Sequence, residues 1–300
     1  MKQITVFTPT YNRASLLPQC YGALKRQTCQ DFIWRIVDDG STDGTEALVS
    51  SWVDEGYIEI EYIYQENKGM HGAHNAGHKN LNTELCIGCD SDDYLFDDCI
   101  EKVLLRWNSR NRSIDYSGVI GMCKSSSGDI LAEIPARLDE TTLYDLRYRW
   151  KIKGDFKFAL RSDLLMQYEY PMIEGENYLA VGYIYFLIDQ SHKMLVIHDS
   201  LCCQDYLDGG ESRGKIKRYV TSPKGFMVYR NEMIPIMHSL KEKWWQATHY
   251  VSSSIFAGDH AFIKNASRKS IVIAAIPSGI ALNLYIRRRY VKRYGTIPRH

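Results

Sequence analysis

The sequence predicts an α/β fold in which a mostly parallel sheet is followed by a helical C-terminal region. In about the first 90 residues, short β-branched and aromatic runs alternate with stretches of helical apolar spacing. This alternation is typical of a parallel sheet with helices between its strands. Each predicted strand also ends in a polar cluster, and ligands of parallel sheets bind beyond the carboxyl ends of the strands. The sequence therefore predicts a ligand site at one edge of the sheet.

The first strand contains β-branched and aromatic residues and breaks at Pro9, and the second ends in Asp38 and Asp39. The third leads to Asn67 and Lys68. The predicted elements, in chain order, are strands at residues 4–8, 32–37, 58–64 and 85–88, with helices at 16–28, about 45–54 and around His74. Further strands are predicted at 157–160 and 194–198, with a helix ending near Ile188.

Three carboxylates, Asp90, Asp92 and Asp93, follow the fourth strand almost directly. Like charges this close together repel, so such a cluster usually needs a cation. Aspartate oxygens in an Asp-x-Asp pattern suit Mg²⁺ or Mn²⁺ bound together with the phosphates of a substrate. The alternative is that Asp92 or Asp93 caps a helix that begins near Asp97.

Four segments in this region occur in a familiar order and spacing. They are residues 8–13 (TPTYNR), 37–43 (VDDGSTD), 67–77 (with Asn-x-Gly at both ends) and 90–93 (DSDD). Together they resemble the nucleotide-binding half of a glycosyltransferase family 2 enzyme with the GT-A fold, a Rossmann-like sheet. The resemblance is strong to about residue 120 and weaker to about 215. It implies a catalytic domain over 1–225, with a nucleotide-binding half (1–120) and an acceptor half (121–225), before a helical region (226–300).

The resemblance implies an inverting glycosyltransferase, of hexosyl or N-acetylhexosaminyl type. Its donor would be a UDP-sugar, and its acceptor a hydroxyl of a saccharide or lipid-linked saccharide, in bacterial surface polysaccharide synthesis. The metal, Mn²⁺ or Mg²⁺, would be held by Asp92 and Asp90, with His198 as a further ligand. Nucleotide contacts are implied for Thr8, Pro9, Tyr11, Arg13, Asp38, Asp39, Lys68, His74, Asp90 and Ser91.

The catalytic base is expected near residue 175, where the resemblance places an acidic residue at the start of a helix. Relatives often have Glu-Asp here, whereas this chain has Glu174-Gly175-Glu176. Glu176 is nearer the predicted helix and is our first choice, with Glu174 as the alternative. Either could instead be an acidic residue stabilised by the helix dipole. A loop at 205–213 could close over the diphosphate, with Arg213 or Lys215 neutralising it.

His71, His74 and His78 share one face of a short predicted helix. Relatives often have Arg at the position of His74. The spacing allows a zinc site, but no fourth ligand is evident. A phosphate could instead bind at the mouth of the helix, and polar residues lining a wet cleft are a third interpretation.

Composition fits a cytosolic enzyme whose eight cysteines stay reduced, with no signal peptide before the first strand. From Lys264 onward there are nine Lys or Arg and no acid, although the net charge of the chain is only +1. The apolar stretch 271–286 is shorter than the roughly 20 residues that span a bilayer. It is expected either to lie at the inner face of the cell membrane, as in a peripheral protein, or to pack on the domain. A nucleic-acid partner is not expected.

Two other functions remain open from the residues. A sugar nucleotidyltransferase would need a Gly-rich basic loop after the first strand, and residues 9–13 contain no glycine. A non-catalytic nucleotide-sugar-binding module would not need all the acidic clusters. Slow hydrolysis of a nucleotide sugar would separate these functions from a glycosyltransferase.

Overall fold

The computed structural model describes residues 2–205 and 215–297. They form two compact units. Of the described residues, the first unit contains 2–170 and 184–205 and holds the sheet; the second contains 171–183 and 215–297, and its regular elements are helices. The second unit thus takes in a segment that we had assigned to the acceptor half. The predicted loop with Arg213 lies outside the described residues.

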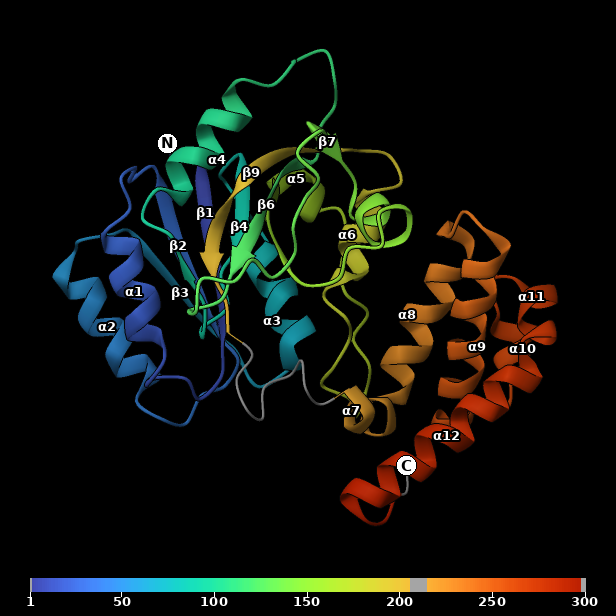
Figure 1. The fold of residues 1–300 in the computed structure, drawn as a ribbon. Helices are drawn as coiled ribbons and strands as arrows, with labels where there is room; N and C mark the ends of the chain where they lie inside the picture. The colour runs from blue at the N-terminus through green and yellow to red at the C-terminus, as the bar shows by residue number, and fades with distance from the viewer. Residues whose placement is uncertain (1, 206–214, 298–300) are drawn as a thin grey trace. The chain divides into compact units, whose positions relative to one another are not determined.

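Figure 1 labels the elements along the chain. The strands are β1 (Ile4–Thr10), β2 (Phe32–Asp38), β3 (Ile60–Tyr64), β4 (Leu85–Gly88), β5 (Tyr94–Leu95), β6 (Gly118–Lys124), β7 (Glu140–Thr141), β8 (Phe156–Arg161) and β9 (Met194–Cys203). The helices of the first unit are α1 (Leu17–Lys25), α2 (Thr45–Glu55), α3 (Gly69–His78), α4 (Cys99–Asn108), the π-helix Asp145–Arg149, α5 (Ser162–Leu165) and most of α6 (Gly182–Ile188). The second unit contains α7 (Lys215–Thr221), α8 (Pro223–Ile236), α9 (Leu240–Ala257), α10 (Phe262–Asn265), α11 (Lys269–Ala274) and α12 (Ile276–Tyr294).

The sheet follows the order β3-β2-β1-β4-β8-β6-β9-β5, with β7 paired to β9. The first four strands are parallel, as the sequence predicts, and β8 joins β4 antiparallel. The fold class is therefore confirmed: a mixed α/β sheet followed by C-terminal helices. The capping alternative for the carboxylates is wrong, because α4 begins after Asp98 and neither Asp92 nor Asp93 caps it.

One face of the parallel half is a buried apolar core that α1, α2 and α4 cover. Trp34 of β2 stacks near Trp52 of α2 and Tyr21 of α1, with Tyr21 and Trp52 ring centroids 4.4 Å apart. The indole nitrogen of Trp34 donates to Thr8 Oγ1 at 2.9 Å. This hydrogen bond satisfies two polar atoms inside the core, as burial requires.

The opposite face of β1 packs on α3, which lies across the sheet from α1 and α2 (Figure 1). Phe7 contacts the rings of His74 and His78, at centroid distances of 5.0 and 5.5 Å. A Cβ at Gly77 would lie 2.2 Å from the Phe7 ring, so this close approach requires glycine. Buried Arg35 donates to the carbonyl oxygens of Gly77 and Lys79, and so ties the end of α3 to β2.

The second unit is built around α9, which a capping box of Ser239 and Glu242 begins. Helix α12 packs on α9 through small and polar residues. Gly279 is so close to Val251 that a Cβ would lie 2.5 Å from it, and Asn283 donates to the carbonyl oxygen of Ser252 at 3.1 Å. One face of α12 is thus a packed helix face, which was one of the two expectations for this region.

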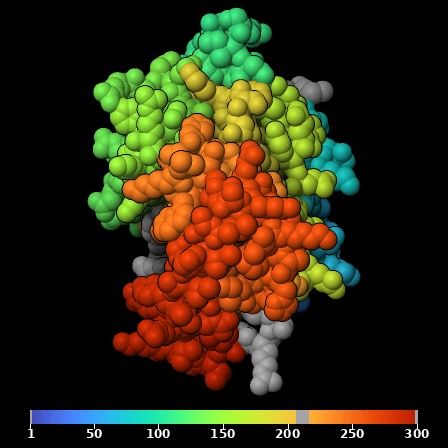
Figure 2. All heavy atoms as spheres, turned by 90° about the vertical axis from the view of Figure 1, so that its right-hand side faces the viewer, coloured from blue at the N-terminus to red at the C-terminus, as the bar shows by residue number. Residues whose placement is uncertain are grey.

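The other face of α12 is open to solvent, and Figure 2 shows residues of the last helices, in red, at the surface. Ile280, Leu284 and Val291 are 45%, 52% and 50% exposed on this face. At 100° per residue these three side chains form one narrow stripe along the helix. Within the described residues, no helix is long and apolar enough to cross a membrane.

The buried histidines of α3 predict how stability changes with pH. Burial is the main cause that lowers the pKa of His74 to about 4 and of His78 to about 3. Electrostatic interaction with His71 also lowers the pKa of His74, and interaction with His74 and Arg35 that of His78. In the unfolded chain both titrate near 6.5. Between those values the unfolded chain binds more protons, so their contribution to stability is complete above pH 6.5 and is lost as the pH falls.

We expect the double variant His74→Phe, His78→Phe to gain stability relative to the parent as the pH falls from 7 to 5. The gain approaches about 2.7 kcal/mol per pH unit, one proton for each histidine. Urea unfolding of both proteins at several pH values measures it. The buried acids Asp93 and Asp189, whose pKa values burial raises, act in the opposite sense but are present in both proteins. A difference that does not change with pH would contradict the prediction.

Candidate active site

The carboxyl ends of β1, β2 and β4 lie side by side, with β1 between the other two strands. Thr10 lies beside Asp38 in the parallel register of β1 and β2, and the Asp39 amide donates to the Thr10 carbonyl oxygen at 2.9 Å. On the other side, the Cys89 amide donates to the Phe7 carbonyl oxygen at 2.8 Å. Because β1, β2 and β4 are parallel neighbours, their carboxyl ends lie on one side of the sheet, here called the edge with Asp39, and the residues that follow these strands meet there.

The two aspartates after β2 have different partners. Asp38 is fully used: its Oδ1 accepts from the Ser41 amide at 2.8 Å and its Oδ2 from the Tyr62 hydroxyl at 2.6 Å. Burial, and then this hydrogen bond, raise the pKa of Tyr62. Asp39 Oδ1 accepts from Gln65 and from the Lys68 amide, while its Oδ2 has no hydrogen-bond partner among the described residues. Asp39 therefore keeps one acceptor oxygen for a ligand.

The loop after β1 is tied to the loop after β2 by hydrogen bonds between side chains and backbone amides. Asn12 adopts a left-handed conformation, with φ of 51°, and accepts the Thr42 amide proton on its side chain. Its own amide donates to Ser41 Oγ at 2.8 Å. Gly40 has φ of 84°, and a Cβ there would lie 2.9 Å from the Asn67 amide nitrogen. Glycine thus allows the loop after β2 to lie against the loop after β3.

The carboxylates after β4 also differ in whether they are exposed or have internal partners. Asp90 is exposed, and Asp92 is half-buried with its Oδ2 3.4 Å from the Arg13 guanidinium. Asp93 is buried, and its Oδ2 lies 3.5 Å from the Lys157 ammonium. Burial raises the pKa of Asp93 to about 9, with Lys157 opposing it. Asp93 thus belongs to the core, and Asp90 and Asp92 are the carboxylates available to a ligand.

Asp90 and Asp92 fit a divalent cation that shares its coordination with a substrate. Mg²⁺-type ions commonly take one or two carboxylates and complete their shell with water and phosphate oxygens. In the described part of the chain, no group of three or more His, Cys, Asp or Glu could hold a metal on its own. This finding gives no support to zinc at His71, His74 and His78.

His198 is placed away from this pair. Its imidazole hydrogen-bonds the Leu138 carbonyl oxygen at 2.8 Å. On the same strand, Cys202 Sγ lies 3.9 Å from Asp93 Oδ2. His198 comes four residues before Cys202, which corresponds to about 13 Å of extended strand. We therefore leave His198 out of the metal ligands that we propose below.

Several other expected nucleotide contacts also have internal partners. The Thr8 hydroxyl is bonded to Trp34 in the core, and His74 is 5% exposed between the rings of Phe7, His78 and Tyr170. Ser91 is buried, Pro9 is half-buried, and the side chains of Tyr11 and Lys68 are exposed at the edge. The Thr8 hydroxyl is thus already used in the core. His74 Nδ1 has no hydrogen-bond partner among the described residues, but the side chain is buried, so we leave both residues out of the proposed contacts.

Two residues at the edge were missed. Thr10 is buried, and its hydroxyl has no hydrogen-bond partner within the part of the chain that the structure describes; Gln65 binds Asp39. Strand alternation could have found Thr10, because it shares a face with Thr8 and lies nearer the strand end. The motif residue Asn75 is structural: its amide exchanges two 2.8 Å hydrogen bonds with the Tyr170 backbone.

The two candidate bases lie in the second unit and differ sharply. Glu176 is 7% exposed, and its carboxylate oxygens accept the amide protons of Lys224 and Gly225 at 2.9 and 2.7 Å. These are the free N–H groups at the start of α8, so Glu176 caps that helix from outside. Glu174 is exposed and has no partner among the described residues.

The family model described as "Glycosyl transferase family 2" matches residues 5–166, more than half of the chain. The chain therefore belongs to glycosyltransferase family 2. The match spans the edge with Asp39, Asp90 and Asp92 and all four motif segments.

Curated relatives match over shorter segments. The chain is 33% identical over 99 residues to glycosyltransferase GlyA of Streptococcus pneumoniae, covering 33% of this chain and 14% of that protein. It is 39% identical over 92 residues to a validoxylamine A glucosyltransferase of Streptomyces hygroscopicus, covering 29% and 21%. The chain thus matches less than a quarter of the length of either relative.

Solved structures share the fold over nearly the whole chain. TarS 1–349 of S. aureus, in complex with UDP-GlcNAc, matches with a TM-score of 0.62 at 16% identity, covering 98% of this chain and 90% of that one. The mannosyltransferase PcManGT of Pyrobaculum calidifontis, in complex with GDP-Man and Mn²⁺, matches with a TM-score of 0.56 at 18% identity, covering 96% and 82%. The GT-A architecture expected from the sequence is confirmed.

Proposed function

We propose that this protein is an inverting glycosyltransferase that transfers a sugar from a UDP-sugar to a hydroxyl of a saccharide or lipid-linked saccharide, in the synthesis of a bacterial surface polysaccharide. The observation that carries the proposal is the free oxygen of Asp39 on the same sheet edge as Asp90 and Asp92. At one end of this edge, Asp39 offers a hydrogen-bond acceptor to the nucleobase, and at the other end Asp90 and Asp92 offer carboxylates to a metal-bound diphosphate. Family membership supports the reaction class.

The single free oxygen of Asp39 favours uracil over the other bases. Uracil presents one imide N–H on its pairing edge, which one carboxylate oxygen can accept. Guanine presents two adjacent donors, N1–H and N2–H₂, which need both oxygens, and Asp39 Oδ1 is already occupied by Gln65 and Lys68. Adenine presents no N–H at the position equivalent to N3–H of uracil. The exposed ring of Tyr11 lies on the loop beside this position and is proposed to stack on the base.

Asp92 and Asp90 are the residues proposed to hold Mn²⁺ or Mg²⁺, which would neutralise charge on the diphosphate as it leaves. Arg13, 3.4 Å from Asp92, fixes the orientation of that carboxylate. The guanidinium also places a positive charge beside the expected path of the diphosphate. It thereby compensates for the repulsion that two carboxylates would exert on a nucleotide.

For the transfer step we propose a single in-line displacement. The acceptor oxygen bonds to the anomeric carbon, the bond from that carbon to the diphosphate breaks, and the acceptor proton passes to a carboxylate. Sequence reasoning favoured Glu176, but both its oxygens already accept amide protons from α8. We now favour Glu174, whose carboxylate is exposed, and assign Glu176 the role of positioning the segment that carries it.

The proposed recognition of uracil predicts a specific effect of a substitution at Asp39. In Asp39→Asn, the remaining oxygen can keep the Lys68 amide, and the new NH₂ group then faces the uracil N–H, donor against donor. UDP affinity should fall about ten- to a hundredfold, the value of one charge-assisted hydrogen bond. Calorimetry with UDP, GDP and ADP measures it. Asp38→Asn is the matched control, because both Asp38 oxygens are used internally. Equal affinity of the parent for the three nucleotides would reject uracil recognition.

The metal assignment predicts that UDP binding depends on a divalent cation. We expect UDP affinity with Mn²⁺ to collapse on adding EDTA and in Asp92→Asn. Asp97→Asn, a change at an exposed carboxylate paired with Arg26, should bind as the parent does. Titration of Mn²⁺ with and without UDP completes the measurement. Full UDP affinity in EDTA would exclude this role for Asp92.

With Glu174 as the general base, we expect Glu174→Gln to bind the UDP-sugar normally but to transfer the sugar about 10²–10⁴ times more slowly, the usual cost of losing a general base. Glu176→Gln should instead lower the melting temperature, because one backbone amide of α8 loses its acceptor. Transfer assays and thermal unfolding of both variants separate the two roles. A fully active Glu174→Gln, or a product with retained anomeric configuration, would overturn the step.

We also propose that the protein works at the cytoplasmic face of a membrane, bound through the open face of α12. The exposed stripe of Ile280, Leu284 and Val291 adjoins Arg288 and Lys292. Each basic residue near an anionic surface contributes about 1 kcal/mol, and apolar side chains enter the headgroup region. Attachment there would bring the enzyme to lipid-linked acceptors.

In a flotation assay, the full chain should bind anionic vesicles, bind neutral ones weakly and be released by salt. Leu284→Glu with Val291→Glu should abolish the binding. Leu105→Glu provides the matched control, because Leu105 is 66% exposed on α4 in the other unit. A parent protein that stays unbound with anionic vesicles at low salt would leave α12 as a packed helix only.

A further inference from the structure

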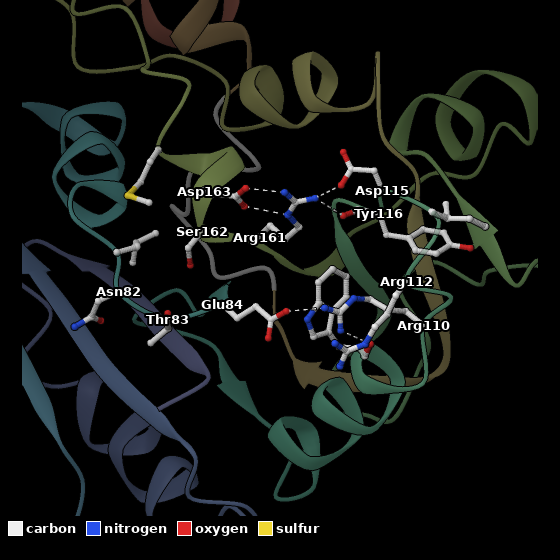
Figure 3. Close-up of a pocket in the computed structure, with 14 residues that line it drawn as sticks. Asn82, Thr83, Glu84, Arg110, Arg112, Asp115, Tyr116, Arg161, Ser162 and Asp163 are labelled. Carbon is white, nitrogen blue, oxygen red and sulfur yellow. Dashed lines mark hydrogen bonds and ion pairs between the residues drawn. The ribbon is translucent and has the colours of Figure 1, made fainter. Parts of the chain in front are cut away.

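A hollow lies in the first unit beyond the amino end of β4, on the opposite side of the sheet from Asp90 and Asp92. It has a volume of about 600 Å³, within the range of small-molecule sites. Asn82, Thr83 and Glu84 line it immediately before β4, and Arg161 lines it at the end of β8 (Figure 3). Strand β4 separates the hollow from the carboxylates, so the two sites are about 13 Å or more apart.

The positive and negative side chains that line the hollow are equal in number. The guanidinium of Arg110 lies 2.8 Å from Glu84 Oε1 on one side. Arg161 binds Asp163 at 2.6 Å and also Asp115 on the other side, and Figure 3 shows the two groups facing each other across the hollow. The lining residues comprise three arginines and three carboxylates, so its formal charge is zero.

Some hydrogen-bonding capacity remains free. Arg112 is exposed and, in the described ranges, has neither an ion-pair nor a hydrogen-bond partner. The same is true of the Asn82 amide, and Glu84 uses only one oxygen. A ligand would therefore meet N–H donors from Arg112 and Asn82 and acceptor oxygens from Asn82 and Glu84. The exposed side chains of Ile114 and Met166 give the rim apolar surface.

These features fit a neutral ligand with many hydroxyls better than an anion. A hydroxyl both donates and accepts, so it can use both kinds of group at once. An anion would meet Arg112 but also three carboxylates, which repel it. We propose that this hollow binds a saccharide segment, such as a more distant part of the acceptor or product chain. The proposal rests on the function proposed above only in that it takes the substrate to be a saccharide.

Such a site would hold a chain at a second point while its end reacts at the other edge. Two linked contacts raise the effective concentration of the reacting end without any new contact at the transfer site. The site is then expected to affect the use of long acceptors and to leave hydrolysis of the donor unchanged.

Saturation-transfer NMR on the full chain tests this with two neutral probes, maltotriose and N,N′,N″-triacetylchitotriose, at millimolar concentration. Arg112→Ala removes the free cation, and Asn82→Trp fills the hollow. Arg149→Ala is the matched control, an exposed arginine of the same unit outside the hollow. UDP binding is measured on every sample, and inorganic phosphate is added as an anionic competitor.

The expected result is saturation transfer to at least one trisaccharide, with affinity at least about tenfold lower in Arg112→Ala and Asn82→Trp. Arg149→Ala should behave as the parent does, and UDP binding should be equal in all four proteins. The proposal falls if neither trisaccharide receives saturation, if both lining variants keep the signal, or if phosphate abolishes it. Loss of UDP binding in the parent would reject the proposed function instead, so the two failures are distinguishable.

Discussion

The site depends on the position of β1 between β2 and β4. Parallel hydrogen bonding on both sides of this strand sets Thr10 against Asp39 and Phe7 against Cys89, and so brings two loops to one edge. The Asp39 amide bonds to β1 while its side chain binds the loop after β3. A shift of register on either side would move Asp39 away from Asp92. The rest of the first unit, from the Trp34 core to α3, holds these three strands in register.

Much of this edge could be predicted from the sequence. The four strands are β-branched, aromatic or apolar runs, and each is followed by residues that favour turns, so their ends were predicted to within a few residues. Because parallel strands end on the same side of a sheet, the predicted alternation of strands and helices then placed Asp39 and Asp92 together. Family resemblance added the assignment of a base and a metal to the two ends. The fold class and the position of the edge were therefore accessible.

What the sequence could not provide is where each polar side chain points. Thr8 and Asp38 have the residue types that bind nucleotides, yet Trp34 and Tyr62 use their polar atoms. Glu176 is acidic and near a helix, but the helix whose amides it accepts begins almost fifty residues later in the chain. These partners are distant in sequence, so only tertiary packing decides between a structural and a ligand-binding role. The hollow at the opposite edge combines residues from three separate segments and has no sequence signature.

Turnover of nucleotide sugars without an acceptor tests the central claim most directly, because water can replace the acceptor slowly and needs no knowledge of it. The purified chain, with Mn²⁺, is incubated with panels of UDP-, GDP- and ADP-sugars, and release of each nucleoside diphosphate is measured. The account predicts UDP release from at least one UDP-sugar and none of GDP or ADP from the other donors. Release from GDP- or ADP-sugars with every UDP-sugar left intact would contradict it, and so would a complete absence of turnover.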